Sequence, residues 1–263
     1  MLNLDRMAPN IIRELIRKQE ITGPTAGMSK RFAQANLVIL KKEYAFDFLL
    51  FCQRNPKSCP LLDVTEPGSF NPSKIAKDAD IRKDIPKYRI YRDGVYTEEV
   101  TNITGYWEDD MVGFLLGCSF TFETPLIESG IPIRHIEEHC NVPMYKTNIP
   151  CEKAGIFEGP TVVSMRPMSH KDAIRAIQIT SRFPSVHGSP IHIGDPSQIG
   201  IADISRPDFG DSVTIKEGEI PVFWACGVTP QAVALQSKPS LMITHAPGHM
   251  FISDVQDEKL SVL

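Results

Sequence analysis

The chain has 263 residues, of which 42% are hydrophobic and 23% are charged, and its formal net charge is -4. This is the composition of a globular protein long enough for one large domain or two small ones. The charge shows no basic bias toward nucleic acid or anionic membranes, and no apolar run reaches the roughly 20 residues of a transmembrane helix. Because the first residues also lack the apolar stretch of a signal peptide, we expect a cytoplasmic protein without nucleic-acid or membrane partners.

The N-terminal third has the apolar spacing of helices. Isoleucine and leucine recur at helical spacing over residues 10–19, and residues 33–40 and 43–52 are apolar segments of helical or mixed character. Residues 60–86, rich in Pro, Asp, Gly and Ser, predict a long irregular connection. Such a connection either contributes to a functional site or is a plain surface excursion.

A β-hairpin and a further helix are predicted next. Residues 88–91 and 95–97 are two short strand patterns around the turn sequence Asp93-Gly94. Residues 107–116 predict a helix, because three acidic residues in its first turn suit the positive end of the helix dipole.

The middle of the chain predicts a separate unit. Short strands are expected at residues 144–147 and 161–165, followed by a helix that a capping box opens at Ser169 and that ends near Arg182. This order of two strands and a helix predicts a smaller α+β subdomain inserted into a larger domain.

We place the inserted subdomain at residues 131–187, which leaves a discontinuous main α/β domain of residues 1–130 and 188–263. In the C-terminal part of the main domain, strand patterns alternate with turns and helix starts. Because strands joined by helical crossovers pair in parallel, we predict a mixed or parallel sheet core with helices on both faces. The three strand patterns are residues 191–193, 220–225 and 241–244.

The turns after these strands are predicted to bind a small carboxylate. Open α/β sheets bind ligands beyond the carboxyl ends of their strands. Asp195 and Thr229, each followed by Pro, are predicted helix N-caps, and the free N–H groups at helix starts attract anions. No nucleotide-binding GxGxxG or GxxxxGK[ST] motif occurs. Ordinary turns with ordinary caps are the alternative interpretation.

Several side chains near these turns can carry protons. The six cysteines form no CxxC pair and are sparse for a secreted scaffold, so most should be reduced and buried. Cys226 ends a strand just before a predicted helix start, where a thiolate is favoured as nucleophile or acid/base; a structural thiol is the alternative. His187 and His245 are candidate acid/base groups. We predict no metal site, because Pro and Gly interrupt the spacing of the late histidines.

Two arginines are candidate anchors for a substrate carboxylate. Arg166 follows a strand and Arg182 ends a helix. A guanidinium can form two parallel hydrogen bonds with a carboxylate. Surface ion pairing is the alternative at each position. Residues 117–123 combine two hydroxyl side chains and one acid with apolar neighbours. They either line a pocket or only form a helix end.

Nine segments of the chain form a specific combination. They are QANL (34–37), DFLLFCQRNP (47–56), CPLLDV (59–64), GCSFTFE (117–123), TNIPC (147–151), VSMRP (163–167), IGDP (193–196), FWACGVTPQ (223–231) and THAPG (244–248). In this combination the chain resembles the bacterial hydro-lyase family to which the D-glutamate cyclase domain is similar, and the resemblance extends from Arg13 to Asp254. Residues 28–32 (MSKRF) depart from the family pattern, so the substrate can differ if this loop shapes substrate choice.

The resemblance implies an α/β core with a smaller inserted unit and a hydro-lyase activity, with cyclisation of D-glutamate to 5-oxo-D-proline as the leading reaction. That reaction needs a base, an acid, donors for an oxyanion and an anchor for a carboxylate, and no cofactor. The catalytic candidates are Cys226, His245, His187 and Asp195. The substrate-binding candidates are Arg166, Arg182, Ser119, Thr121, Asn148, Thr229 and Gln231.

Two other functions would use much the same residues. One is an amidohydrolase or lactamase that depends on Cys226, and the other is a non-catalytic protein that binds a metabolite. The partner expected in every case is a small carboxylate. The sequence leaves the oligomeric state open, a homo-oligomer included.

Overall fold

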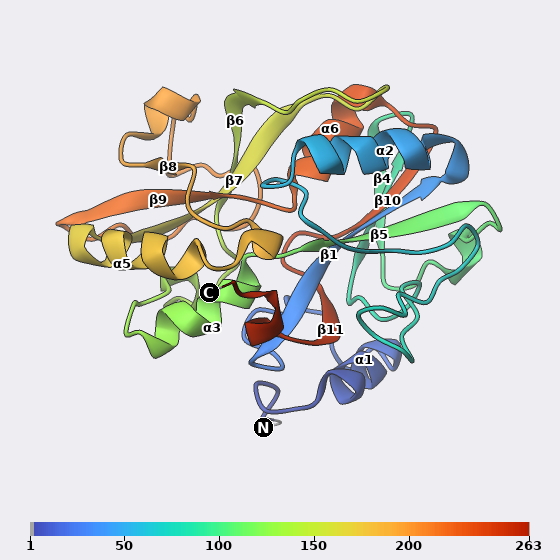
Figure 1. The fold of residues 1–263 in the computed structure, drawn as a ribbon, viewed down its shortest axis with the longest axis horizontal. Coiled ribbons are helices and arrows are strands. Elements are labelled where there is room, and N and C mark those ends of the chain that lie inside the picture. Colours follow the sequence, from blue (N-terminus) through green and yellow to red (C-terminus); the bar gives the residue numbers. More distant parts are fainter. Residues whose placement is uncertain (1–2, 263) are drawn as a thin grey trace.

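Two β-sheets form the frame of the protein, and most helices pack against them (Figure 1). The computed structural model describes residues 3–262. The first sheet contains β1 (Phe32–Lys41), β2 (Leu61–Val64), β3 (Tyr88–Arg92), β4 (Val95–Val100), β5 (Met111–Gly117), β10 (Leu241–His245) and β11 (Phe251–Gln256). The second contains β6 (Met144–Pro150), β7 (Pro160–Ser169), β8 (His192–Ile193) and β9 (Glu219–Ala225).

The strand order is β2-β5-β1-β10-β3-β4 in the first sheet, where β11 also pairs with β1, and β6-β7-β9-β8 in the second. The α-helices are α1 (Pro9–Arg17), α2 (Lys42–Arg54), α3 (Phe120–Glu128), α4 (Arg134–Glu137), α5 (His170–Thr180) and α6 (Thr229–Ser237). Short 3-10 helices are η1 (Thr104–Tyr106), η2 (Pro184–Val186), η3 (Pro196–Ile199) and η4 (Asp257–Leu260).

Every strand pairing within residues 3–262 is antiparallel, so the mixed or parallel sheet expected from the sequence is wrong. The predicted strand, turn and helix do occur at β9 and α6, followed by β10. However, β9 and β10 belong to different sheets. Helix α6 therefore connects the two sheets instead of crossing over within one, and no parallel pair results. The general mixture of helices and strands is as predicted.

The central strands of the first sheet, β1 and β5, lie where the sequence predicted helical or mixed segments. Both strands are buried along almost their whole length. In β1, Leu37 faces one hydrophobic cluster and Val38 faces another on the opposite side of the sheet. A strand buried on both faces has a continuous apolar sequence without alternation, which does not distinguish it from a buried helix.

The two faces of the first sheet are covered differently. Helices α2 and α6 cover one face, with Phe48, Phe51 and Val233 in the same cluster as Val38. The long connection between β2 and β3 covers the other face and buries Ile81 and Ile85. This predicted irregular segment is therefore part of the core.

The second sheet confirms the strands expected at residues 144–147 and 161–165 and the helix after them. Ser169 caps α5, and its side chain accepts a hydrogen bond from the N–H of Asp172. Helices α3 and α5 pack on one face of this sheet around Trp224. The inserted subdomain was predicted to end at residue 187, whereas strands β8 and β9, which follow that residue, belong to the same sheet as β6 and β7. The boundary of the subdomain stays a prediction.

The β3–β4 hairpin is also confirmed. Asp93 and Gly94 form its turn with φ angles of 49° and 77°, the left-handed conformations that such a turn requires. The hairpin places Arg89 and Glu99 side by side at paired positions.

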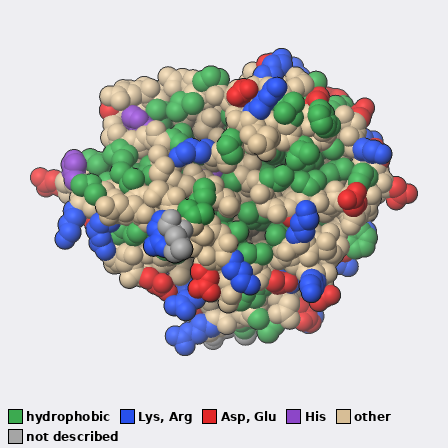
Figure 2. All heavy atoms as spheres, viewed as in Figure 1, with side chains coloured by type: hydrophobic (Ala, Val, Ile, Leu, Met, Phe, Trp, Pro, Cys, Tyr) green, Lys and Arg blue, Asp and Glu red, His purple; other side chains and the backbone are tan. Residues whose placement is uncertain are grey.

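The surface shows mixed charge. In the view of Figure 2, acidic and basic side chains are interspersed rather than gathered by sign. Along residues 3–262, the structure contains no helix that is long and apolar enough to cross a membrane.

Candidate active site

A groove of about 480 Å³, which we name the interface groove, opens between segments of the two sheets. Strands β3 and β4 and the β10–β11 loop supply one wall. The loops before β6 and before β9 supply the other. The groove is lined by Pro24, Arg89, Glu99, Asn141, Asp208, Phe209, Gly210, Asp211, Ala246, Pro247 and His249.

Asn141 ties the two walls together. Its Nδ2 donates to the carbonyl of Pro247 (3.2 Å), and its backbone N–H donates to the carboxylate of Asp211 (2.8 Å). Gly248 has a φ of 80°, and a Cβ at this position would lie 2.6 Å from the side-chain amide of Asn141. Glycine is required for this conformation and this close approach. Within the described residues, Asn141 Oδ1 is buried without a hydrogen-bond partner, so a bound molecule can supply one.

The groove carries an ion pair on one wall and two carboxylates on the other. On the first wall, Arg89 Nε donates to Glu99 Oε1 (2.9 Å), and the guanidinium lies 5.4 Å from the ring centroid of Tyr96. On the second wall, Asp208 and Asp211 present carboxylates. A cation facing two carboxylates matches the separated charges of an amino-acid zwitterion.

His249 is the one imidazole in the groove lining. Its Nδ1 lies 2.9 Å from the carbonyl of Pro247. Because a carbonyl only accepts, Nδ1 carries the proton and Nε2 keeps its lone pair. Burial lowers the pKa of His249, and Lys87 and Arg89 lower it further. His249 is therefore neutral near pH 7 and able to accept a proton.

A hydrogen-bond network connects the groove to Gln231 and His245, both predicted from the sequence. Gln231 Oε1 accepts from the hydroxyl of Tyr91 (3.2 Å), and its Nε2 donates to the carbonyl of His245 (2.8 Å). Arg89 approaches the same Oε1 at 3.5 Å. The His245 ring binds the N–H of Leu37 through Nδ1 (3.1 Å), and burial lowers its pKa to about 4. Gln231 and His245 thus support the wall that carries Arg89.

Two thiols lie beneath the groove. Cys118 follows β5 and precedes α3, and Cys226 follows β9 and precedes α6. Both belong to a hydrophobic cluster that also includes Phe209 from the groove lining. Burial raises the pKa of Cys226 to about 11, and it raises the pKa of Cys118 as well. The expected thiolate at Cys226 is therefore absent near neutral pH, because desolvation outweighs the amide of Val228 that faces the sulfur.

Arg166 lies in a buried ion-pair cluster and is only 1% exposed. Its Nε donates to Glu123 Oε1 (3.0 Å), and its terminal nitrogens donate to Ser164 and Ser119 (both 3.1 Å). His135 Nε2 lies 3.2 Å from the same Glu123 oxygen. Although burial raises the pKa of Glu123, His135 and Arg166 lower it to about 2. Arg166 and Ser119 were predicted to bind substrate. In this structure they bind each other, and Arg166 also binds Glu123.

His187 lies on the same side of the molecule as this cluster, and Arg166 contributes to its pKa. Its backbone is left-handed, with a φ of 85°, and its Nδ1 lies 2.6 Å from the carbonyl of Lys57. Burial lowers the pKa of His187 to about 4. Its Nε2 is buried without a partner among residues 3–262.

The remaining predicted residues lie elsewhere. Thr229 and Thr121 accept hydrogen bonds from the backbone amides of Val162 and Gln34, which fixes the packing of α6 and α3. Three are exposed at separate places: Asp195 caps η3, Asn148 lines a cavity of about 350 Å³, and Arg182 lines one of about 720 Å³. The structure therefore does not gather the predicted site residues at one point.

Sequence reasoning missed Arg89 and Asn141 altogether. Arg89 stands in a predicted hairpin strand, and no local pattern marks either residue as part of a site. His249 was noticed only for its spacing from His245, although its place beside Pro247-Gly248 was a usable signal. In the described part of the chain, no three His, Cys, Asp or Glu side chains form a group that could hold a metal ion.

Comparison with known proteins places the chain in a family. A family model described as D-glutamate cyclase matches residues 112–254. A protein from Geobacillus kaustophilus, "Putative hydro-lyase GK2103", is 69% identical over 98% of each chain. A Bacillus licheniformis protein of the same "Putative hydro-lyase" type is 66% identical over the full length of both chains. "Putative hydro-lyase YcsI" from Bacillus subtilis is 67% identical over 98% of this chain and all of its own.

The chain therefore belongs to the D-glutamate cyclase family, which confirms the resemblance seen in the sequence. The matched region includes Asn141, Asp208, Asp211 and His249 of the interface groove, whereas Arg89 precedes it. Among solved structures, a nitrogen repressor-like protein from Methanococcus jannaschii aligns over 93% of this chain and 97% of its own, with 8% identity and a TM-score of 0.38. That likeness is too weak to support a conclusion.

Proposed function

We propose that this protein is a hydro-lyase that acts on a small amino or dicarboxylic acid in the interface groove, and that it cyclises D-glutamate to 5-oxo-D-proline with loss of water. Membership of the D-glutamate cyclase family and the names of its relatives support the reaction class. The observation that carries the location is that Arg89 and His249 line the same groove as the carboxylates of Asp208 and Asp211.

The charges define one orientation of the substrate. The α-carboxylate of D-glutamate pairs with Arg89, which Glu99 and Tyr96 hold in place. The ammonium group faces Asp208 and Asp211 on the opposite wall. This arrangement folds the molecule so that its nitrogen and its side-chain carboxyl come together, and such positioning can supply several kcal/mol of the barrier.

His249 is the base of the proposed reaction. Its Nε2 takes a proton from the ammonium group, and the freed nitrogen attacks the side-chain carboxyl carbon to form the ring C–N bond. A second proton leaves the nitrogen, and the two protons depart with one carboxyl oxygen as water. The unpartnered Oδ1 of Asn141 accepts a hydrogen bond from the substrate nitrogen and so helps to orient it for attack. Atoms balance without an oxidant or a reductant.

The direct test is formation of 5-oxoproline from D-glutamate by the purified protein, measured by chromatography, with L-glutamate as the stereochemical comparison. We expect product from the D-isomer. Arg89→Met should lower kcat/KM roughly tenfold to a hundredfold, because a charge-assisted hydrogen bond contributes about 1.5–3 kcal/mol. Arg92→Met, on the same strand but outside the groove lining, is the matched control. No product from D-glutamate or related acids at high enzyme concentration would reject the proposal.

A further inference from the structure

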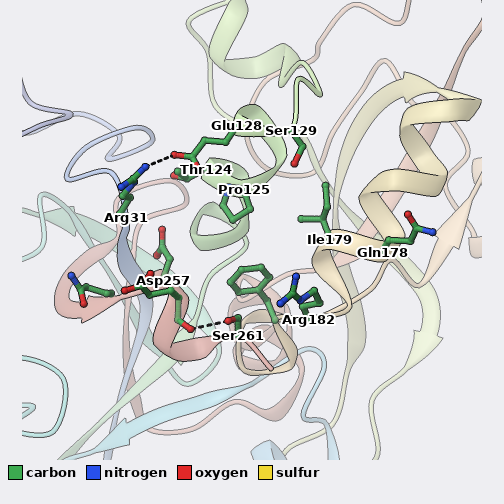
Figure 3. A pocket seen from close by; sticks show the side chains of 13 residues that line it. Arg31, Thr124, Pro125, Glu128, Ser129, Gln178, Ile179, Arg182, Asp257 and Ser261 are labelled. Atoms are coloured by element: carbon green, nitrogen blue, oxygen red, sulfur yellow. Dashed lines mark hydrogen bonds and ion pairs between the residues drawn. The ribbon is translucent and has the colours of Figure 1, made fainter. Parts of the chain in front are cut away.

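A second cavity lies away from the interface groove, near the C-terminal end of the chain. It has a volume of about 720 Å³ and lies between the ends of α3 and α5 and the 3-10 helix η4 (Figure 3). Pro125, Ile179 and Phe183 give it an apolar wall. In Figure 3, Asp257 lies on the side of the cavity opposite Ile179. None of the reaction chemistry above involves this cavity.

Asp257 is an unpaired acid in the cavity lining. The residue is only 6% exposed, and its Oδ1 has no hydrogen-bond partner among residues 3–262. Its backbone N–H donates to the carbonyl of Arg31 (2.9 Å), which fixes its position at the start of η4. Burial raises the pKa of Asp257 to about 7, and Glu128 adds to the shift. Without a cation beside it, the buried carboxylate of Asp257 tends to take up a proton, and a cationic ligand would stabilise the ionised form instead.

The two arginines of the cavity are already engaged. Arg31 pairs with Glu128 (3.0 Å), and Arg182 Nε donates to the carbonyl of Val262 (3.3 Å). With Glu258 also in the lining, the cavity holds one more acid than base. Helices α3 and α5 both end at the cavity, and the negative ends of their dipoles favour a cation there.

We infer that this cavity is a second binding site, specific for a small alkylammonium compound. The ammonium group pairs with the carboxylate of Asp257, and the hydrocarbon chain lies against Pro125, Ile179 and Phe183. Binding removes the desolvation penalty on Asp257 and covers apolar surface at the same time. The site is independent of the reaction proposed for the interface groove.

Isothermal titration calorimetry of the full chain tests this inference with two probes of equal chain length. At pH 8, pentylammonium should bind, and pentanoate should not. Because only the ionised carboxylate pairs with the ligand, the affinity should fall about tenfold between pH 8 and pH 6. Asp257→Asn should abolish binding, whereas Asp203→Asn, at an exposed carboxyl outside the cavity lining, should leave it unchanged.

A second variant covers the case in which Asp257→Asn alters the fold. Ile179→Trp leaves Asp257 intact and fills the cavity from its apolar wall, so it should also abolish binding. The inference is overturned if pentylammonium does not bind at millimolar concentration, if pentanoate binds instead, or if folded Asp257→Asn retains binding. Glutamate cyclisation should proceed normally in all of these variants, so failure here is distinct from failure of the proposed reaction.

Discussion

At the scale of single residues, the described residues that line the interface groove include one imidazole, one arginine and three carboxylates. The carbonyl of Pro247 fixes which nitrogen of His249 carries the proton. Burial and two neighbouring cations keep that imidazole uncharged near pH 7. The same physical effects suit it to the proposed role of base and decide the pH below which it would become charged.

Replacement of His249 by Gln should lower kcat roughly a hundredfold to ten-thousandfold, the usual contribution of a general base. The wild-type activity should fall as pH drops below the lowered pKa of His249, because the imidazole then becomes charged and no longer accepts a proton. A pH–rate profile of 5-oxoproline formation measures both effects. His192→Gln, which lies outside the groove lining, should behave as wild type. A variant His249→Gln with full activity and an unchanged profile would remove His249 from the mechanism.

The role of Cys226 distinguishes the proposed hydro-lyase from a cysteine-dependent amidohydrolase. Since burial raises the pKa of its thiol to about 11, iodoacetamide should react slowly near pH 7. We expect Cys226→Ala to retain activity and to lose about 1 kcal/mol of stability, the cost of a small cavity. Activity assays combined with urea unfolding give both values. A folded Cys226→Ala protein without activity would favour the nucleophilic cysteine instead.

At the scale of elements, the loop between β10 and β11 carries His249, the proposed base, and packs against the opposite wall of the groove. Gly248 makes this possible through its positive φ and its closeness to Asn141. Gly248→Ala should therefore displace the loop and lower kcat/KM at least tenfold. Gly218→Ala is the matched control, because Gly218 has a similar φ of 81° with no neighbouring atom within 4 Å. Both variants should lose about 1–2 kcal/mol from backbone strain, but only Gly248→Ala should lose activity.

At the scale of the whole molecule, the buried cluster of Arg166, Glu123 and His135 joins a helix that follows the first sheet to a strand of the second. Removal of the negative charge of Glu123 would leave the buried Arg166 with only neutral partners. Glu123→Gln should lower the free energy of unfolding at pH 7 by roughly 3–5 kcal/mol, as measured by urea denaturation. Ser119→Ala, which removes one neutral partner of Arg166, should cost only about 1 kcal/mol.

The same cluster predicts a pH dependence with a defined sign. The pKa of Glu123 in the folded protein is about 2, below its usual value of 4.5. Its contribution to stability is therefore complete above pH 4.5 and is lost as the pH falls toward 2. The stability difference between the wild type and Glu123→Gln should shrink over that range. A constant difference from pH 7 to pH 2 would contradict the ionised state of Glu123.

Local signals in the sequence predicted several elements well. The capping box at Ser169, the Asp93-Gly94 turn and the strand patterns of β6, β7, β9 and β10 all depend on neighbours in the chain. Strands β1 and β5 were missed, because burial on both faces removes the alternation that marks a strand. The parallel sheet was wrong, because no local pattern states which sheet a strand joins.

By itself the sequence determined the family, the mixture of helices and strands, and the kinds of side chain available for acid/base chemistry. Only the tertiary structure decided which of them share a groove. Three residues of the groove, Arg89, Asn141 and His249, come from distant parts of the chain. They line one groove because strands of the first sheet pack against loops that lead into strands of the second. Burial then determined what each candidate can do: it keeps the thiol of Cys226 protonated and engages Arg166 inside the protein. Desolvation depends on the folded surroundings, and so the sequence pattern alone does not reveal it.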